Sequence, residues 1–456
     1  MTRFPLGSRA IGALATGALA AAAARAGAQN PTPVAAPPAA PQTVAIVGGT
    51  VYPVSGPRIE NGTVLIRDGR IVAVGANVTV PADARRVDAA GKIVTPGLVN
   101  GATQLGVVEV GSVGDTRNAS ARGREGIAAS FRVTDAFNAR STLLPPARQD
   151  GITTAVVVPG AGLVAGQAGV ADLASRSGRE DAIEMIRRNS VAMVVQLEAG
   201  GGGEGGRGGG SASRGETFDR LRELLNDARV YRRTRAAYER GDSRDLSASR
   251  ADLEALLPVL DGTLPMLVVA NKASDIETSL RFAREFGAKL IIGEGAEAWE
   301  VADQLAAARV PVLTGAMNNI PSSFSTLGQR QENAALLARA GVPVAIIGNA
   351  GGGDEDAFNA RNVRYEAGNA VAYGLPWEQA LRAVTLGPAE IFGVADRVGA
   401  LAPGRDANVV VWSGDPFEFA TRAEHVFVRG REVRDDTRQD QLTRRYRTLP
   451  GTGYRP

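Results

Sequence analysis

The chain has 456 residues, of which 44% are hydrophobic and 22% charged, with 51 Lys and Arg against 48 Asp and Glu. This composition excludes a disordered or fibrous protein, and because a single core stops growing at roughly 250 to 300 residues, we expect one large domain and a second small one. Cysteine is absent, which excludes disulfides, thiol nucleophiles, Cys-based metal sites and lipid attachment through an N-terminal Cys.

Residues 1–28 have the pattern of a cleaved secretory signal peptide. Arg3 and Arg9 precede an apolar run over 11–24, and Ala26-Gly27-Ala28 supplies the small-x-small pattern of a cleavage site. A retained membrane anchor is the alternative, but Arg25 interrupts the run and alanine is only weakly apolar. We therefore expect an exported, periplasmic protein that does not bind the membrane after cleavage.

Loss of this segment also changes the charge of the protein. Three arginines are removed with it and no acid, which leaves 48 basic residues against 48 acidic ones. The mature protein is then close to neutral, so the basic excess of the full chain is no reason to expect a nucleic-acid or membrane partner.

The chain then passes from a linker into a small β-rich domain. Residues 29–42 are rich in Pro and Ala and are predicted to be a linker. Residues 43–95 hold short β-like runs at 44–47, 62–66 and 70–75, and the Asp68-Gly69 step between two of them is a strong hairpin signal. We interpret 43–95 as the N-terminal part of a β-sandwich.

Between 96 and 392, apolar β-branched runs alternate with stretches of helical spacing. The strands are predicted at 98–104, 153–158, 169–173, 191–197, 265–271, 289–293, 311–315 and 343–348, and helices between them include 275–286, 299–309 and 330–340. This alternation predicts a TIM-like (β/α)8 barrel, in which reactive groups sit at the carboxyl ends of the strands. A Gly-rich insertion at 199–215 is predicted to be a flexible loop rather than a nucleotide-binding turn.

Strand-like sequence returns after the barrel. The runs 399–412 and 426–433 resemble the N-terminal strands in length and pattern. Residues 393–437 are therefore predicted to complete a composite β-sandwich built from both chain ends, and 438–456 to form a tail. The predicted fold class is α/β.

Three stretches resemble the amidohydrolase superfamily, particularly its imidazolonepropionase-like and prolidase-like branch. They are Lys92-Ile93-Val94-Thr95-Pro96-Gly97-Leu98-Val99, then Tyr365-Glu366-Ala367-Gly368 with Leu386-Gly387-Pro388-Ala389-Glu390-Ile391, and the 399–412 run that returns into the β-domain. The resemblance covers about residues 43–435. It implies descent from enzymes that hydrolyse non-peptide C–N bonds or dipeptides with the help of bound zinc.

The positions at which the resemblance places the metal ligands carry other residues. An active member would have a His-x-His pair on the first strand, where Ala102 and Gln104 stand. The fifth-strand histidine falls at Val269 and the sixth-strand one near Glu294. The aspartate that ends the eighth strand, a ligand and general base, aligns with Asn349, which cannot take a proton from a metal-bound water.

Composition supports the same conclusion, because the single histidine of the chain is His425, in the returning β-domain. Without imidazole or thiolate, a zinc site of the usual kind is not expected, and we predict no cofactor. An oxygen-only site for a hard cation stays open. Its candidate ligands are Glu109, Asp115, Glu294 and the run Asp354-Glu355-Asp356, with a carboxylated Lys272 as a further alternative.

The remaining polar residues define the candidate site. Lys272, Glu294 and Asn349 are predicted to converge at the barrel mouth, either as a His-free catalytic group or with Lys272 and Glu294 as an ion pair in place of the lost metal. Amides at strand ends could bind a ligand or satisfy one another. By family position, the pocket-lining residues are Asn100, Ala102, Gln104, Gln167, Val269, Asn271, Glu294, Asn318 and Asn349, and Thr103 and Asn319 also lie at strand ends.

Two functional hypotheses follow. The first is a non-catalytic amidohydrolase-like protein that binds a small molecule in the barrel mouth or forms an oligomer, with itself or with a catalytic paralogue. The second is an active hydrolase with a non-classical site that contains no histidine.

Overall fold

Two eight-stranded sheets form the framework of the part of the chain that the structure describes. In this computed structural model the described residues are 43–121, 123, 126–175, 177, 179–197, 213–348, 356–434 and 437–447. The predicted signal peptide, the linker, the Gly-rich run 200–210 and Asn349 lie outside them. None of the helices in these ranges is both long and apolar enough to cross a membrane.

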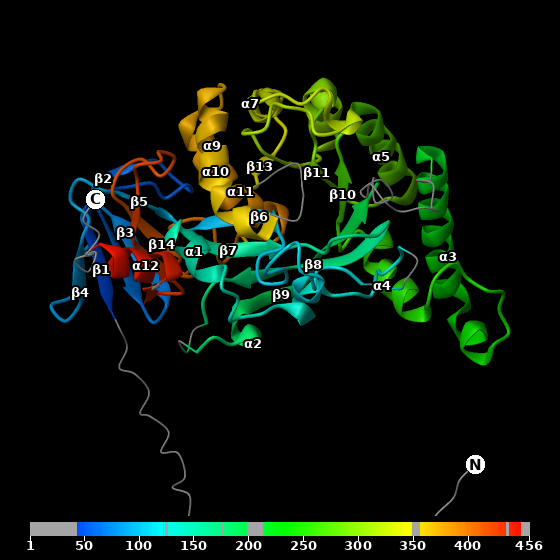
Figure 1. Cartoon of the computed structure of the whole chain (residues 1–456), viewed down its shortest axis with the longest axis horizontal. Helices are drawn as coiled ribbons and strands as arrows, with labels where there is room; N and C mark the ends of the chain where they lie inside the picture. Colours follow the sequence, from blue (N-terminus) through cyan, green and yellow to red (C-terminus); the bar gives the residue numbers. More distant parts are fainter. Residues whose placement is uncertain are drawn as a thin grey trace, which may run out of the picture. The chain divides into compact units, whose positions relative to one another are not determined.

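Both ends of the chain contribute to the first sheet, as the sequence predicts (Figure 1). C-terminal β14 pairs antiparallel with β5, with Val409 opposite Pro96 and Trp412 opposite Ile93. The turn between β2 and β3 is made by Asp68 and Gly69, both at positive φ, which is what a tight hairpin turn needs. The strands of this sheet are β1 (Val44–Val51), β2 (Ile59–Arg67), β3 (Arg70–Gly75), β4 (Arg85–Asp88), β5 (Ile93–Pro96), β14 (Val409–Trp412), β15 (Ala423–Val428) and β16 (Arg431–Val433).

The second sheet is the nearly closed barrel. Its strands follow one another in chain order, and β13 at one end also contacts β6 at the other. This agrees with the predicted barrel. The strands are β6 (Leu98–Thr103), β7 (Ile152–Val157), β8 (Val164–Asp172), β9 (Ile186–Gln196), β10 (Met266–Ala270), β11 (Leu290–Glu294), β12 (Val312–Thr314) and β13 (Val344–Ile346).

One strand departs from the predicted (β/α)8 alternation. β8 runs antiparallel to both β7 and β9, and only the four-residue α2 (Ala182–Met185) lies between β8 and β9. The expectation of a helix after every strand is therefore wrong in this sector. The physical reason is the short connection over 158–163 between β7 and β8, since a parallel crossover needs a dozen or more residues.

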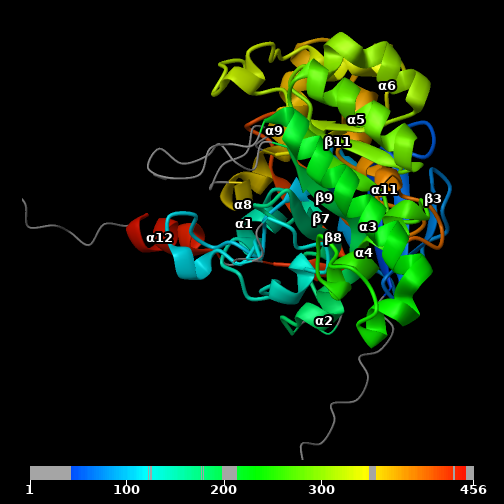
Figure 2. The same cartoon turned by 90° about the vertical axis from the view of Figure 1, so that its right-hand side faces the viewer.

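Helices cover the rest of the barrel (Figure 2). The predicted helix at 299–309 is divided into a 3-10 turn and α6. The tail also forms a helix, α12, with no buried residue. The α-helices are α1 (Leu144–Gln149), α3 (Arg214–Arg240), α4 (Arg250–Leu260), α5 (Ala273–Phe286), α6 (Ala302–Ala308), α7 (Asn333–Arg339), α8 (Asp356–Asn359), α9 (Val363–Ala372), α10 (Trp377–Ala383), α11 (Leu386–Ile391) and α12 (Arg438–Tyr446). The 3-10 helices are η1 (Gly114–Thr116), η2 (Val133–Ala136), η3 (Ala298–Val301), η4 (Phe324–Thr326) and η5 (Ala360–Asn362).

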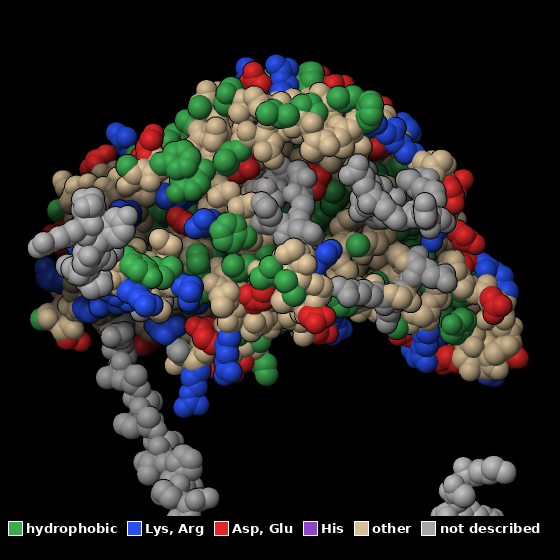
Figure 3. All heavy atoms as spheres, viewed as in Figure 1, with side chains coloured by type: hydrophobic (Ala, Val, Ile, Leu, Met, Phe, Trp, Pro, Cys, Tyr) green, Lys and Arg blue, Asp and Glu red, His purple; other side chains and the backbone are tan. Residues whose placement is uncertain are grey.

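Apolar side chains form a core of barrel-strand residues. Leu267, Ile291 and Leu313 come from neighbouring strands and belong to one buried cluster together with Phe392. Helices pack on the strands through a separate cluster that includes Leu221. On the face shown in Figure 3, acidic and basic side chains are interspersed. The core thus fixes the barrel strands, and with them the positions of their ends.

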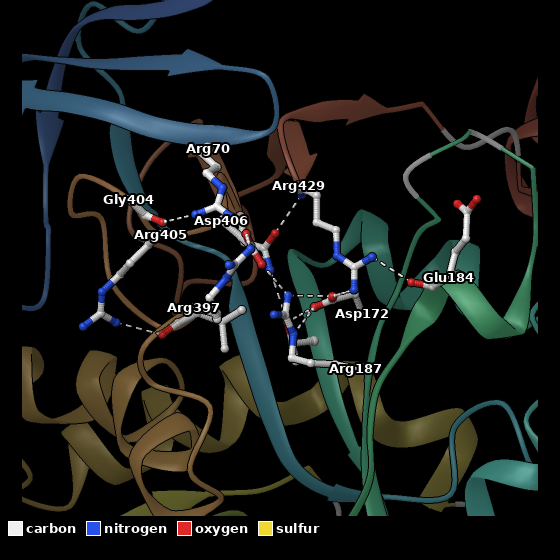
Figure 4. A network of polar contacts seen from close by, with 12 residues as sticks. Arg70, Asp172, Glu184, Arg187, Arg397, Gly404, Arg405, Asp406 and Arg429 are labelled. Atoms are coloured by element: carbon white, nitrogen blue, oxygen red, sulfur yellow. Dashed lines mark hydrogen bonds and ion pairs between the residues drawn. The ribbon is translucent and has the colours of Figure 1, made fainter.

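A buried ion network joins the barrel to the returning C-terminal segment (Figure 4). Asp172, at the end of β8, is fully buried and accepts a hydrogen bond from Thr154 Oγ1 at 3.1 Å. Arg187 Nη2 lies 2.7 Å from Asp172 Oδ2 and 2.7 Å from Asp406 Oδ2. Arg429 also pairs with Asp172, and Arg397 pairs with Asp406. The two carboxylates and three guanidiniums hold segments far apart in the chain together.

Burial and the neighbouring arginines shift the pKa of the Asp406 carboxyl in opposite directions. Burial raises the pKa of its carboxyl, but hydrogen bonds from Arg397 and Arg187 and their charges lower it, and the net pKa lies below its ordinary value. A carboxyl whose pKa is lower in the folded state contributes stability above its unfolded pKa, about 3.9 for Asp, and loses it as the pH falls through the folded pKa.

Replacing Asp406 by Asn should therefore destabilise the protein in a pH-dependent way. At pH 7 we expect a loss of about 1.5–3 kcal/mol, because half-buried Arg397 loses its counter-charge and Arg187 keeps only Asp172. The difference from wild type should shrink as the pH falls below about 4, since wild-type Asp406 becomes protonated too. Urea unfolding across this pH range measures both effects.

Asp219, which pairs with Arg222 and is 78% exposed at its side chain, provides the control. Asp219→Asn should change the free energy of unfolding by less than about 1 kcal/mol. Equal effects of the two substitutions would show that the buried network does not stabilise the fold.

Candidate functional site

A small polar pocket lies at the carboxyl ends of three neighbouring barrel strands. Asn271 follows β10, Glu294 ends β11 and Thr314 ends β12. The cavity volume is ≈ 20 Å³, about the space that one water molecule needs. The lining residues are Asn271, Glu294, Ala296, Thr314, Gly315, Asn318, Thr326, Gln329, Arg330 and Asn333.

Glu294 is the carboxylate of this pocket and is held in place by its neighbour. Asn271 Nδ2 donates to Glu294 Oε2 at 2.7 Å, and Asn271 Oδ1 accepts from the backbone N–H of Ala296 at 3.2 Å. Glu294 has a φ of +64° and is followed by Gly295 at +56°. A side chain in this left-handed region costs about 1–2 kcal/mol, and such strain is concentrated at functional sites.

Asn333, the first residue of α7, leaves a buried acceptor in the same pocket. Its side chain is 3% exposed, and its Nδ2 donates to the carbonyl of Gly295 at 2.9 Å and to Thr314 Oγ1 at 3.1 Å. Because Nδ2 faces a carbonyl, the amide orientation is determined. Its Oδ1 has no hydrogen-bond partner among the described residues. An unpaired buried acceptor costs about 1–3 kcal/mol, so a water or ligand donor is expected beside it.

Glu366 on α9 organises the loop after β12. Its side chain is buried, and Oε2 accepts from the backbone N–H groups of Ala316 at 2.5 Å and Met317 at 2.7 Å. It thereby fixes the chain just after Gly315, which lines the pocket. Glu366 falls in one of the motifs noted in the sequence, but its role depends on a contact across 49 residues that no local pattern reveals.

Of the predicted pocket residues, Asn271, Glu294 and Asn318 line this cavity. Sequence reasoning missed Thr314, Thr326, Gln329, Arg330 and Asn333. The only local signals are that Thr314 lies next to the end of the predicted strand 311–315 and that Asn333 is a polar residue in the first turn of the predicted helix 330–340.

Two predicted pocket amides are bonded elsewhere. Asn100 is fully buried and donates to the carbonyl of Ala360 at 3.1 Å. Gln167 is 8% exposed and donates from Nε2 to the carbonyl of Ala129 at 2.9 Å. Neither lines the pocket around Glu294. Both amides therefore donate to backbone carbonyls distant in the sequence, and neither donates to the other, as the prediction that amides satisfy one another had it.

Two of the three positions assigned to the first- and fifth-strand histidines carry apolar side chains, and the third carries an amide. Ala102 packs against the buried cluster of barrel-strand residues. Val269 lies opposite Gly293 on the neighbouring strand and packs closely on it, since a Cβ placed on that glycine would be 3.3 Å from Val269 Cγ2. Gln104, which follows β6, is half-buried, and its Nε2 would be 3.2 Å from a Cβ at Gly160.

The proposed convergence of Lys272, Glu294 and Asn349 is only partly described. Lys272 caps the start of α5 and is half-buried, and it forms no ion pair with another described side chain. The carboxylate of Glu294 is held by Asn271 instead. Asn349, Asp354 and Glu355 lie outside the described residues, as does the side chain of Asp356.

The candidate cation ligands are dispersed. Glu109 accepts hydrogen bonds from Asn138 Nδ2 at 3.0 Å and from Thr142 Oγ1 at 3.2 Å, and Asp115 is exposed in η1. Thr103 uses its hydroxyl to accept from the N–H of Leu105, and Asn319 donates to Gln331. These residues do not join Glu294 in its pocket.

The residues present do not fit a zinc ion. His425, the one imidazole, lies on β15 in the other sheet, with Nδ1 2.7 Å from Glu432 Oε1. In the described ranges, no group of three or more His, Cys, Asp or Glu side chains is placed to hold a metal ion. A Zn²⁺ site is built from imidazole, thiolate and carboxylate ligands, usually four in number.

The strain at Glu294 can be measured with two substitutions that both remove the carboxylate. Glu294→Gly should be more stable than Glu294→Ala by about 1 kcal/mol, because glycine adopts positive φ without a Cβ penalty. Thermal or urea unfolding of the pair gives the difference. If the alanine variant proved the more stable one, Glu294 would not be strained in solution.

The comparisons with known proteins all point to one family. The sequence profile of the amidohydrolase family matches residues 268–433. The chain is 24% identical over 404 residues to an amidohydrolase of Hapsidospora irregularis, covering 82% of this chain and 40% of that protein. It is also 24% identical over 390 residues to an imidazolonepropionase of Acidiphilium cryptum, covering 79% of this chain and 89% of that protein. The chain thus spans less than half the length of the fungal relative.

The fold is shared with solved structures. An amidohydrolase from Thermotoga maritima superposes with a TM-score of 0.74 at 26% identity, covering 86% of this chain and all of that one, 100%. The fold, with its barrel and its second sheet built from both chain ends, points to the same family as the sequence relatives do. These findings together support membership of the amidohydrolase superfamily.

Proposed function

We propose that this protein is a ligand-binding member of the superfamily that does not carry out the metal-dependent hydrolysis implied by the family resemblance. Because the cavity has room for about one water-sized group, the ligand is held by a single N–H or O–H donor group that enters the pocket at the ends of β10, β11 and β12. The observation that carries the proposal is the buried, unpaired Oδ1 of Asn333 in the pocket that also holds Glu294.

The chemistry of the pocket supports a donor-bearing ligand. Asn333 Oδ1 is an acceptor, and the Glu294 carboxylate is a second one whose position is set by Asn271. Asn318 and Gln329 add amides that can either donate or accept. Arg330 stacks over the Trp299 ring at 4.7 Å, which places a cation at the pocket. An amide or an amino compound matches the two acceptors.

The surroundings of the former metal positions support the loss of hydrolysis. Ala102 and Val269 offer no lone pair to a metal, and Ala102 packs in an apolar cluster. Without a metal-bound water, the pocket has no activated nucleophile, because no histidine base stands beside the Thr314 and Thr326 hydroxyls and neutral amides do not take up protons at neutral pH. Binding without bond cleavage is the function that these side chains perform best.

Substituting Asn333 by Leu should abolish ligand binding. We expect compounds from a panel of small amides and amino compounds to raise the melting temperature of the wild type, but not of Asn333→Leu, because leucine removes the buried acceptor. Differential scanning fluorimetry measures the shift, and calorimetry measures the affinity of each hit.

Asn319→Leu is the matched control. Asn319 lies in the segment between β12 and α7, is exposed and donates to Gln331 rather than lining the pocket. This variant should respond to the hits like the wild type. Equal responses of wild type and Asn333→Leu would contradict the proposed site.

The strained backbone of Glu294 favours a second candidate function, a hydrolase without histidine. In that case dipeptides or cyclic amides would be cleaved, the activity would survive chelators, and Glu294→Gln would abolish it. Under the first proposal, protein purified without a His-tag contains no stoichiometric metal and cleaves none of these substrates. Metal analysis with a substrate panel separates the two, and a stoichiometric metal with hydrolysis would overturn both.

Export and pairing with a relative belong to the same proposal. The signal-like pattern of residues 1–28 supports a periplasmic protein, and loss of the metal ligands in a family frame supports a partner role beside a catalytic paralogue. Protein for the assays above is therefore taken from the periplasmic fraction. Its N-terminus should be Gln29, and a first residue of Met1 would contradict cleavage.

A further inference from the structure

A larger cavity lies at the opposite end of the barrel from the pocket around Glu294. Its lining includes Pro265, Lys289 and Pro311, which directly precede β10, β11 and β12. Because these strands are parallel, the residues before them lie at the amino end of the barrel. The cavity volume is ≈ 650 Å³, within the range of about 300–1,000 Å³ that small-molecule sites occupy.

Basic side chains dominate the charge of this cavity. Arg188, Arg284, Lys289 and Arg309 line it, against the single acid Glu390. Glu390 is already neutralised, because its Oε2 lies 2.5 Å from Arg382 Nη2. Arg188, Lys289 and Arg309 form no ion pair with another described side chain, and Arg284 donates only to the carbonyl of Leu280, at 3.2 Å. The cavity therefore carries an uncompensated positive charge.

Apolar side chains line the same cavity. Leu264, Ile291 and Phe392 are each at most 8% exposed and contribute to its wall. The α5, α6 and α11 helices, labelled in Figure 2, supply much of the rest. A ligand that fits must therefore combine an apolar body with a negative group.

The backbone at Arg309 is a second, independent observation. Arg309 caps the end of α6 at a φ of +53°. The preceding helix α5 ends in the same conformation with Gly287 at +70°, and Gly341 at +84° follows α7. Glycine occupies this conformation without strain, whereas arginine does not. Retaining arginine at a cavity wall, at the expense of backbone strain, suggests that its side chain has a role there.

We propose that this cavity binds an amphipathic organic anion, in which a carboxylate, sulfonate or phosphate group is attached to an aliphatic or aromatic body. The anionic group lies among Arg284, Lys289 and Arg309, and the apolar body lies against Ile291 and Phe392. The site is separate from the pocket around Glu294, and the proposal does not depend on what that pocket binds.

Anilinonaphthalene sulfonate, a fluorescent amphipathic anion, tests this site on the full mature protein. We expect saturable binding that weakens with added salt. Arg284→Gln and Lys289→Gln together should weaken it about threefold to tenfold, the effect of losing two exposed charge interactions. Phenylnaphthylamine, which has the same rings without the sulfonate, should be insensitive to these substitutions.

Two further variants make the test specific. Arg309→Gly should weaken binding of the sulfonate while leaving the melting temperature unchanged or higher, because it removes a cation and relieves strain. Arg281→Gln is the matched control, since Arg281 is exposed on the same helix as Arg284 but does not line the cavity. Wild-type affinity in the charge variants, or an equal loss for the sulfonate and its neutral analogue, would overturn the proposal.

Discussion

The bond between Asp172 and Arg187 is the constraint on which the rest of this architecture depends. Asp172 has no exposed surface. Arg187 pairs both with Asp172, at the end of barrel strand β8, and with Asp406 in the returning C-terminal segment. Two buried carboxylates without arginines would cost several kcal/mol each. The chain ends can therefore form one sheet beside the barrel only if β8, β9 and the C-terminal return are all in place at the same time.

Much of this fold could be predicted from the sequence, because hydrophobic periodicity reports directly on burial. The first strand was expected at 98–104 and is found at Leu98–Thr103, and the hairpin at Asp68-Gly69 forms as its turn chemistry requires. The orientation of β8 could not be predicted in this way. A strand that is buried at every position has no hydrophobic pattern that shows its direction, and only the short connection over 158–163 indicates its orientation.

The candidate site was predictable only where it follows from strand ends. Glu294 and Asn271 end or follow predicted strands, and the structure places them 2.7 Å apart at their polar atoms. Asn333 belongs to a helix, and its significance lies in a missing partner, which depends on what surrounds it in three dimensions. Asn100 was also predicted to line the pocket at the barrel mouth, but its amide donates a hydrogen bond to the carbonyl of Ala360, 260 residues away in the sequence. A local sequence pattern cannot distinguish an amide whose hydrogen bonds are satisfied within the protein from one that could bind a ligand.

The reversed strand has a consequence for how this family's chemistry could be arranged. In a parallel barrel, an acidic residue at the carboxyl end of a strand faces the substrate. Asp172 occupies that place in β8, but it lies opposite Thr154, near the start of β7. Reversal has moved this carboxylate from the reactive end of the barrel to the structural end, where it serves as a counter-ion between domains. At β8, the direction of the strand thus determines whether an acid at its carboxyl end lies at the reactive end of the barrel or at the end that packs against the β-domain.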